Sequence, residues 1–238
     1  MKSLSAVLAV VLALSAAAPL WAQTPETDAL RVLAEQGDAE AQYAFGCMHD
    51  VGCLDETVLS NGQDLEIDSM GDAEAARWYR LAAEQGHAAA QSRLGDFHQF
   101  GYGVPQDYAE AVRWYRSAAE QGCAVAQFNL GVRYAIGRGV PQDDGEAVRW
   151  CRLAAEQGYV DAQWNLGLMY EGGVGVPQDY VVAYVWLNLS ASRRNSADSN
   201  RELVAYGRDR VASKMNPDQF AEAQRLAREW DAAHPREP

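Results

Sequence analysis

The sequence has little positive charge. Its 238 residues include 20 Lys and Arg against 33 Asp and Glu, for a formal net charge of −13 at pH 7. Proteins that bind nucleic acid or anionic lipid headgroups neutralise phosphates with clustered Lys and Arg, so the composition disfavours both classes of ligand. We interpret the acidity as a contribution to solubility. It would also suit a cationic protein or peptide partner.

The sequence also lacks an apolar run long enough to span a membrane. The longest run, residues 4–18, is shorter than the roughly 20 residues that a transmembrane helix needs. It follows Lys2 and precedes Ala22 and Gln23, which is the pattern of a secretory signal peptide. We therefore expect residues 1–22 to be removed. The mature chain should be exported, to the periplasm or as a secreted protein, without stable membrane insertion.

Recognised metal and nucleophile motifs are missing as well. The chain has 4 His, and no His-Glu-x-x-His spacing occurs among them. An acidic segment within residues 53–72 lacks the Asp-x-Asp-x-Asp-Gly spacing of a calcium loop. Outside the expected signal peptide there is no Ser-x-x-Lys and no Gly-x-Ser-x-Gly, the usual acyl-transfer motifs. We therefore expect no catalytic residue, no metal and no cofactor.

What the sequence does have is a repeated unit of 36 residues. Its landmarks recur at that interval: Gly86, Gly122 and Gly158; Trp78, Trp114, Trp150 and Trp186; Pro105, Pro141 and Pro177. A unit of this length cannot bury a core alone, so copies must stack and share hydrophobic faces. The strict spacing of the tryptophans assigns them to the core between stacked units.

Each unit contains two helical patterns. Ala126, Leu130 and Tyr134 recur at i, i+4 and i+8, which is one face of a helix. Residues 137–143 then end this helix with a glycine and begin the next with Asp143 as its cap. The second helix of the preceding unit also gathers its apolar side chains on one face: Ala111, Tyr115, Ala118 and Ala119. Each unit is therefore predicted to be a helical hairpin.

A glycine recurs inside the first helix of each hairpin, at Gly46, Gly95, Gly131 and Gly167. Glycine in a helix interior costs about 1 kcal/mol relative to alanine. Its recurrence indicates that another helix passes too close for a methyl group.

These motifs resemble a known family, the Sel-one-like repeats, which are longer-looped relatives of tetratricopeptide repeats. The resemblance depends on residues 109–122 (AEAVRWYRSAAEQG), Ala126-Gln127, Leu130-Gly131 and Tyr134. It covers roughly residues 28–192 and implies an all-α fold, a right-handed α/α superhelix of stacked helical hairpins. Such proteins act as adaptors or scaffolds for protein partners and are often periplasmic or secreted in bacteria.

The expected organisation has three parts: the signal peptide at residues 1–22, the solenoid at 23–192, and capping helices with a tail at 193–238. The first unit has a 13-residue acidic insertion within residues 53–72, which we interpret as a solvated loop. Two further helices are expected at about residues 201–214 and 217–231. Asn216 is the predicted cap of the second, with Pro217 in its first turn. These helices should cover the exposed end of the stack.

The resemblance also implies where a partner would bind. In tetratricopeptide-like stacks one side of each first helix lines a concave groove, and the matching positions here are Tyr43, Ser92, Asp96, Phe128, Val132, Trp164 and Leu168. The last two units would offer an apolar floor, and the first two a polar, acidic wall that includes Asp50 and Gln99. The alternative is that Phe128 and Trp164 pack against each other between adjacent helices.

Four cysteines in an exported chain suggest disulfides. Cys47 and Cys53 are six residues apart across a predicted helix end, so a local bridge between them is feasible. Cys123 and Cys151 would be offset along their helices, which makes their pairing doubtful. Cys151 also stands in register with Tyr79 and Tyr115, which predicts a buried thiol.

We therefore predict an exported adaptor or scaffold that binds a protein or peptide partner, and not an enzyme. The alternative function is β-lactam binding or weak β-lactam hydrolysis, which has been credited to some cysteine-rich secreted relatives of this family.

Overall fold

The computed structural model describes residues 25–50, 53, 69–194 and 200–235. Within these ranges the regular structure is entirely helical, which confirms the all-α prediction. The expected signal peptide and most of the acidic insertion lie outside the described residues. No described helix is both long and apolar enough to cross a membrane. The chain divides into two compact units, with the boundary between Gln121 and Gly122.

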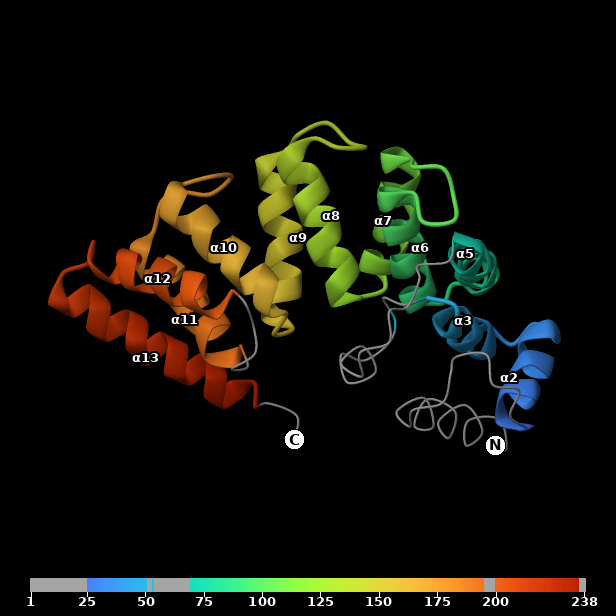
Figure 1. Ribbon diagram of the computed structural model, residues 1–238. Helices are drawn as coiled ribbons and strands as arrows, with labels where there is room; N and C mark the ends of the chain where they lie inside the picture. Colours follow the sequence, from blue (N-terminus) through green and yellow to red (C-terminus); the bar gives the residue numbers. More distant parts are fainter. Residues whose placement is uncertain (1–24, 51–52, 54–68, 195–199, 236–238) are drawn as a thin grey trace. The chain divides into compact units, whose positions relative to one another are not determined.

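The first compact unit contains five described helices: α2 (Pro25–Glu35), α3 (Ala39–Met48), α5 (Ser69–Glu84), α6 (Ala88–Phe100) and α7 (Tyr108–Glu120). Each of these packs against the next along the chain, so α3 with α5 and α6 with α7 form two stacked hairpins (Figure 1). Helix α2 packs on α3 at the start of this stack.

The second compact unit contains six described helices: α8 (Ala124–Ile136), α9 (Asp144–Glu156), α10 (Val160–Gly172), α11 (Tyr180–Arg193), α12 (Arg201–Ala212) and α13 (Pro217–Ala233). Two hairpins, α8–α9 and α10–α11, stack through contacts between α9 and α10. Both α12 and α13 pack on α11, at the end of the stack. The superhelical path implied by the family resemblance stays a prediction.

The glycines and capping residues that were predicted to end and begin the helices do so in the structure. Gly137 follows α8 with a φ of 65°, in the left-handed region that glycine tolerates best. Asp143 then caps α9, because its carboxylate accepts a hydrogen bond from the Glu146 amide. Asn216 caps α13 through a reciprocal capping box with Gln219, and Pro217 occupies the first turn, as predicted.

The recurring helix-interior glycines lie against the second helix of their own hairpin. A Cβ built on Gly95 would lie 2.5 Å from the ring of Tyr115, and one on Gly167 would lie 2.6 Å from Cγ of Leu187. The same clash would occur between Gly46 and Tyr79 and between Gly131 and the Cys151 Sγ, each at 2.8 Å. The predicted close approach of the two helices is confirmed, and the facing side chains are fully buried.

Within each compact unit, a glutamine side chain connects the second hairpin to the first. In the second compact unit, Gln163 of α10 donates to the Ala155 carbonyl of α9 at 3.1 Å. In the first, Gln91 of α6 makes the same bond to Ala83 of α5 at 3.0 Å and accepts one from Gln121 at 2.7 Å. These glutamines add a second donor to carbonyls at helix ends that also accept from the turn amides of Gly86 and Gly158. The repeat is therefore held by polar contacts as well as by apolar packing.

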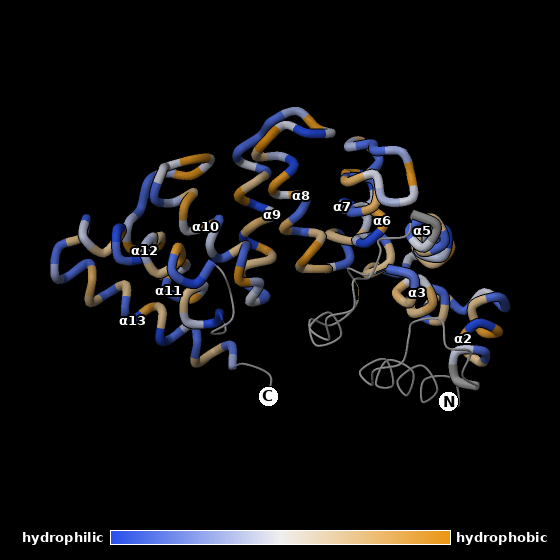
Figure 2. Tube along the Cα trace, viewed as in Figure 1, coloured by the Kyte–Doolittle hydropathy of each residue, from blue (hydrophilic) through white to orange (hydrophobic). Residues whose placement is uncertain are grey.

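The repeated tryptophans lie on the second helices. Trp78 and Trp150 are buried, as predicted, whereas Trp114 and Trp186 are only partly buried. Along the chain, hydrophobic and hydrophilic segments alternate within each helix (Figure 2), as expected for helices that bury one face.

We expect Gly167→Ala to lower the free energy of unfolding by about 1–3 kcal/mol, because the added methyl would meet the buried Leu187 side chain and the Ala183 carbonyl. This loss should exceed the gain of about 1 kcal/mol in helix propensity. The measurement is urea or thermal denaturation, with about 2–4 °C of melting temperature expected for each kcal/mol.

Gly172→Ala in the same helix is the matched control. Its Cβ would make only an ordinary contact, at 3.4 Å from Val174, so its stability should be unchanged or slightly higher. Equal stability of the two variants would contradict the close approach of α10 and α11.

Candidate functional site

We call the side of each first helix that was predicted to line a groove its inner face. Three positions in each helix define it: Tyr43, Cys47 and Asp50 at α3; Ser92, Asp96 and Gln99 on α6; Phe128, Val132 and Ala135 on α8; Trp164, Leu168 and Glu171 on α10. The inner faces of the two compact units differ in chemistry.

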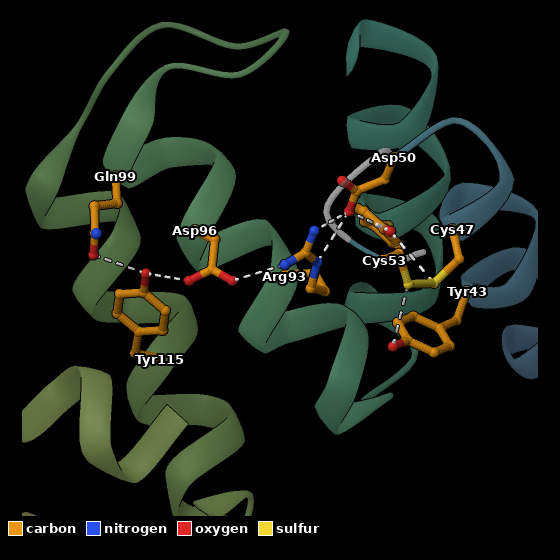
Figure 3. Close-up of polar contacts among 9 residues, drawn as sticks. Tyr43, Cys47, Asp50, Cys53, Arg93, Asp96, Gln99 and Tyr115 are labelled. Atoms are coloured by element: carbon orange, nitrogen blue, oxygen red, sulfur yellow. Dashed lines mark hydrogen bonds and ion pairs between the residues drawn. A yellow bond between two sulfur atoms is a disulfide. The ribbon is translucent and has the colours of Figure 1, made fainter. Parts of the chain in front are cut away.

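In the first unit, the inner faces are joined by a polar network that centres on Asp50 (Figure 3). Asp50 follows α3 and is only 5% exposed. Its Oδ2 accepts hydrogen bonds from the Tyr79 hydroxyl of α5 at 2.7 Å and from Arg93 Nε of α6 at 3.0 Å. Arg93 Nη2 also pairs with the same oxygen. One carboxylate thus ties three helices together.

The network continues from Arg93 to the next hairpin. Arg93 Nη1 lies 3.4 Å from Asp96 Oδ2 on the same helix. The Tyr115 hydroxyl of α7 lies 2.7 Å from Asp96 Oδ1 and 2.9 Å from Gln99 Oε1. The two carboxylates of the predicted acidic wall are therefore already engaged within the chain, by the Arg93 guanidinium and the Tyr79 and Tyr115 hydroxyls.

Burial governs the protonation of this network. Burial, reinforced by the charge and hydrogen bond of Asp50, raises the pKa of the Tyr79 phenol, so it stays a donor. Burial also raises the pKa of the Asp96 carboxyl, against the lowering effects of the Tyr115 hydrogen bond and the Arg93 charge.

Ser92, expected to face a partner, is buried in α6. With 4% of its surface exposed, Ser92 does not face a partner in this structure.

A disulfide joins Cys47 and Cys53, whose Cα atoms are 5.2 Å apart, and Asp50 lies between them. The Tyr79 hydroxyl is 3.4 Å from Cys47 Sγ. The ring of Tyr43 lies over that of His87, with centroids 4.7 Å apart. The disulfide therefore closes the short segment that presents Asp50 to Tyr79 and Arg93.

The other two cysteines are free thiols in the structure. Cys151 is fully buried against Gly131, and burial raises its pKa to about 12. The prediction of a buried thiol in the place of Tyr79 and Tyr115 is confirmed.

In the second unit, the inner face of α8 is apolar and partly exposed. Phe128 lies 5.2 Å from the ring of Tyr159, the residue before α10, and joins the cluster that includes Val148 and Leu166. Trp164 belongs to a different cluster, built on α11, α12 and α13. The two rings therefore pack into separate clusters. Val132, one turn after Phe128, is partly exposed.

Another helix of the chain lies against the inner face of α10, whose Trp164 and Leu168 are partly exposed. A Cβ on Gly207 of α12 would lie 2.6 Å from two atoms of the Trp164 ring, so the α12 backbone lies directly against the indole. Leu168 packs in the same cluster. Trp164 was expected to face an open groove, whereas the structure places α12 against its ring. The expectation that this face binds a partner stays a prediction.

Glu171, at the end of this face, holds α12 electrostatically. Its side chain is 9% exposed, and its Oε1 accepts from Arg210 Nε and from Lys214 Nζ, each at 2.9 Å. Burial acts to raise the pKa of this carboxyl. The hydrogen bonds and charges of the two bases outweigh that effect and hold the pKa below its ordinary value.

The sequence reasoning missed three residues that shape these faces: Arg93, Glu171 and Gly207. Gly207 carried a usable signal, because a glycine inside a predicted helix indicates close packing by the same argument as Gly131. Arg93 and Glu171 carried only a departure from the repeat, since Asn129 and Ala135 stand at their positions in the third hairpin.

We expect Asp50→Asn to destabilise the protein by about 3 kcal/mol, because it removes the carboxylate that pairs most closely with Arg93 and leaves that guanidinium only the 3.4 Å contact with Asp96. The free energy of unfolding by urea is the measurement. Glu35→Gln, which removes the exposed pair with Arg31 in the same compact unit, should change it by less than about 0.5 kcal/mol. Equally small effects of both variants would show that Asp50 does not hold the helices together.

The repeats match a known family at four consecutive segments. The Sel1 repeat is recognised at residues 39–87, 88–123, 124–159 and 160–195, which contain the hairpins α3–α5, α6–α7, α8–α9 and α10–α11. A comparison with curated proteins gave no match.

Among solved structures, the chain is similar to a protective antigen present in uropathogenic Escherichia coli strains that displays an SLR (Sel1-like repeat) fold. The identity is 34%, the TM-score is 0.72, and the match covers 90% of this chain and 42% of that one. The chain thus spans less than half the length of the E. coli protein. It is also similar to a Sel1 repeat protein from Oxalobacter formigenes, with 28% identity, a TM-score of 0.63 and coverage of 89% and 76%. On its sequence and its fold, this chain belongs to the Sel1 repeat family.

Proposed function

We propose that the chain is an exported adaptor that binds a protein or peptide partner through the inner faces of its first helices, without catalysing a reaction. Sel1-like repeat proteins typically serve as protein-interaction scaffolds. The β-lactam alternative would replace this proposal if the purified protein showed stereospecific β-lactam turnover that a single polar substitution abolished.

One observation carries the proposal. In the second compact unit, the inner face of α10 receives a helix, since α12 lies against Trp164 and pairs with Glu171. The inner face of α8 offers Phe128 and Val132, one turn apart and both partly exposed. Aromatic and aliphatic side chains at this spacing suit the apolar face of a partner helix or an extended peptide.

Export is supported by the disulfide between Cys47 and Cys53, because such bonds persist in oxidising compartments and are rare in the cytosol. The E. coli relative is described as a protective antigen, which is consistent with exposure outside the cytoplasm. We expect exported material to begin near Gln23 and to contain the Cys47–Cys53 bridge. N-terminal sequencing and non-reducing peptide mapping test this, and an intact Met1 with reduced Cys47 and Cys53 would overturn it.

We expect Val132→Asp to weaken partner binding at least tenfold, or about 1.4 kcal/mol, because a carboxylate would enter an apolar contact. The partner is first identified with a photo-crosslinking residue at position 132, and is then purified for titration against wild type and variant. The melting temperature of the variant should stay close to that of the wild type, since Val132 is already partly exposed.

Leu153→Asp is the matched control. Leu153 lies on α9, in the same compact unit, and is 37% exposed, but it belongs to a second helix. Its replacement should leave the affinity unchanged. A folded Val132→Asp protein with wild-type affinity, or a larger loss with Leu153→Asp, would place the binding surface away from the inner face of α8.

A further inference from the structure

We propose that the inner face of α10 is a binding site for a basic amphipathic helix, and that α12 occupies this site as an exchangeable internal ligand. The inference rests on the proposed function and specifies the chemistry of one partner segment.

The site itself consists of three residues on one face of α10. Trp164, Leu168 and Glu171 stand at i, i+4 and i+7, so they form a continuous stripe along two turns. The stripe offers an aromatic ring, then an aliphatic side chain, then a carboxylate. Such a surface fits a helix that has a small residue opposite the Trp164 ring and a basic residue opposite the Glu171 carboxylate.

Helix α12 meets those requirements in register. Gly207 lies against the Trp164 ring, where any larger residue would clash. Arg210, one turn later in α12, and Lys214, in the turn just after the helix ends at Ala212, both bind the Glu171 carboxylate. The spacing small-x-x-basic-x-x-x-basic is therefore the pattern by which an occupant of this site is recognised.

Helix α12 buries one narrow face and leaves large apolar side chains outside. Its buried residues are Val204, Gly207 and Val211, while Leu203 and Tyr206 are 56% and 65% exposed. Elements with few buried apolar contacts are the first to open in a native protein. Helix α12 thus combines a specific register with a narrow buried face, formed by Val204, Gly207 and Val211.

Helix α13 has anchors of its own on α11, besides the core cluster that it shares with Val211 of α12. Phe220 packs on Tyr184 with ring centroids 5.2 Å apart, and Trp230 packs on Trp186 at 5.9 Å. Asp231 also pairs with Arg193 of α11 at 2.7 Å. Release of α12 would therefore expose Trp164 and Leu168 while the end of the stack remained covered by α13.

An occupant that displaced α12 would have to bring positive charge. Glu171 is nearly buried, and a buried carboxylate without a cation is strongly unfavourable. The net charge of the chain, −13, also favours the approach of a basic segment. An acidic or neutral helix would leave Glu171 uncompensated, so the site should select basic partners.

The test uses the full chain and a fluorescent synthetic peptide with the sequence of residues 200–215. In the wild type, the tethered α12 competes at an effective concentration on the order of millimolar, so the peptide should bind poorly. In the variant Arg210→Glu with Lys214→Glu, the internal ligand is weakened and the peptide should bind at least about tenfold more tightly. Adding Glu171→Gln to that variant should abolish this gain.

Arg201→Glu with Arg208→Glu is the matched control, because it makes the same charge change on α12 at residues for which no contact with Glu171 occurs in the described structure. Peptide binding should then stay at the wild-type level. Binding that increased equally in this control, or that survived Glu171→Gln, would overturn the proposed site.

Hydrogen exchange of the wild type gives a test that needs no variant. The central amides of α12 should exchange at least about tenfold faster than those of α13, since an exchangeable segment opens before the rest of the stack. Equal protection of α12 and α13 would identify α12 as a permanent part of the fold and overturn the inference. If that occurs while the Val132 partner still binds, only this inference fails and the proposed function stands.

Discussion

The close approach of the two helices in each hairpin is the constraint on which the rest of the structure depends. Because Gly95 admits the Tyr115 ring and Gly167 admits Leu187, the first helix always turns the same side toward its partner. Gln91 and Gln163 then face the preceding hairpin, where they bind backbone carbonyls. With two sides of each first helix committed to packing, the inner face is the side on which residue identity can vary between repeats.

The two compact units use that freedom differently. In the first, Asp50 and Asp96 share Arg93, and the disulfide of Cys47 holds Asp50 in place, so the inner faces become an internal network. In the second, apolar residues such as Val132 remain partly exposed. Buried ion pairs add little net stability compared with apolar packing, but they strongly disfavour any arrangement that separates their partners. The first unit is thereby specified in one conformation, while the second retains surface for contact.

The elements that repeat could be predicted from the sequence, because their chemistry is local. The α-hairpins, the cap of α13 at Asn216 and the buried thiol of Cys151 all follow from spacing within one or two helices. The pairing of Asp50 with Arg93 could not, since 43 residues separate them and neither fits the repeat. The return of α12 onto Trp164 was missed for a related reason: the polar segment after α11 ends the periodicity, so Gly207 indicated a close contact but not its partner. Among the groove residues expected from the family, Ser92 is buried and Trp164 lies against α12, while Phe128 and Val132 remain partly exposed.

The neighbouring first helices of the second unit consequently impose different conditions on anything that contacts them. On α8, Ala135 stands where α10 has Glu171, so a segment seated on Phe128 and Val132 meets no charge at that position and can be wholly apolar. On α10, the carboxylate is nearly buried and must keep a cation, whether from Arg210 and Lys214 or from a partner. A partner that spanned both helices would have to be apolar at one end and basic at the other. Helices α8 and α10 follow the same sequence pattern, but Ala135 on one and Glu171 on the other occupy equivalent positions 36 residues apart. This single difference makes one end of the binding surface apolar and the other acidic, so a partner could bind it in only one orientation.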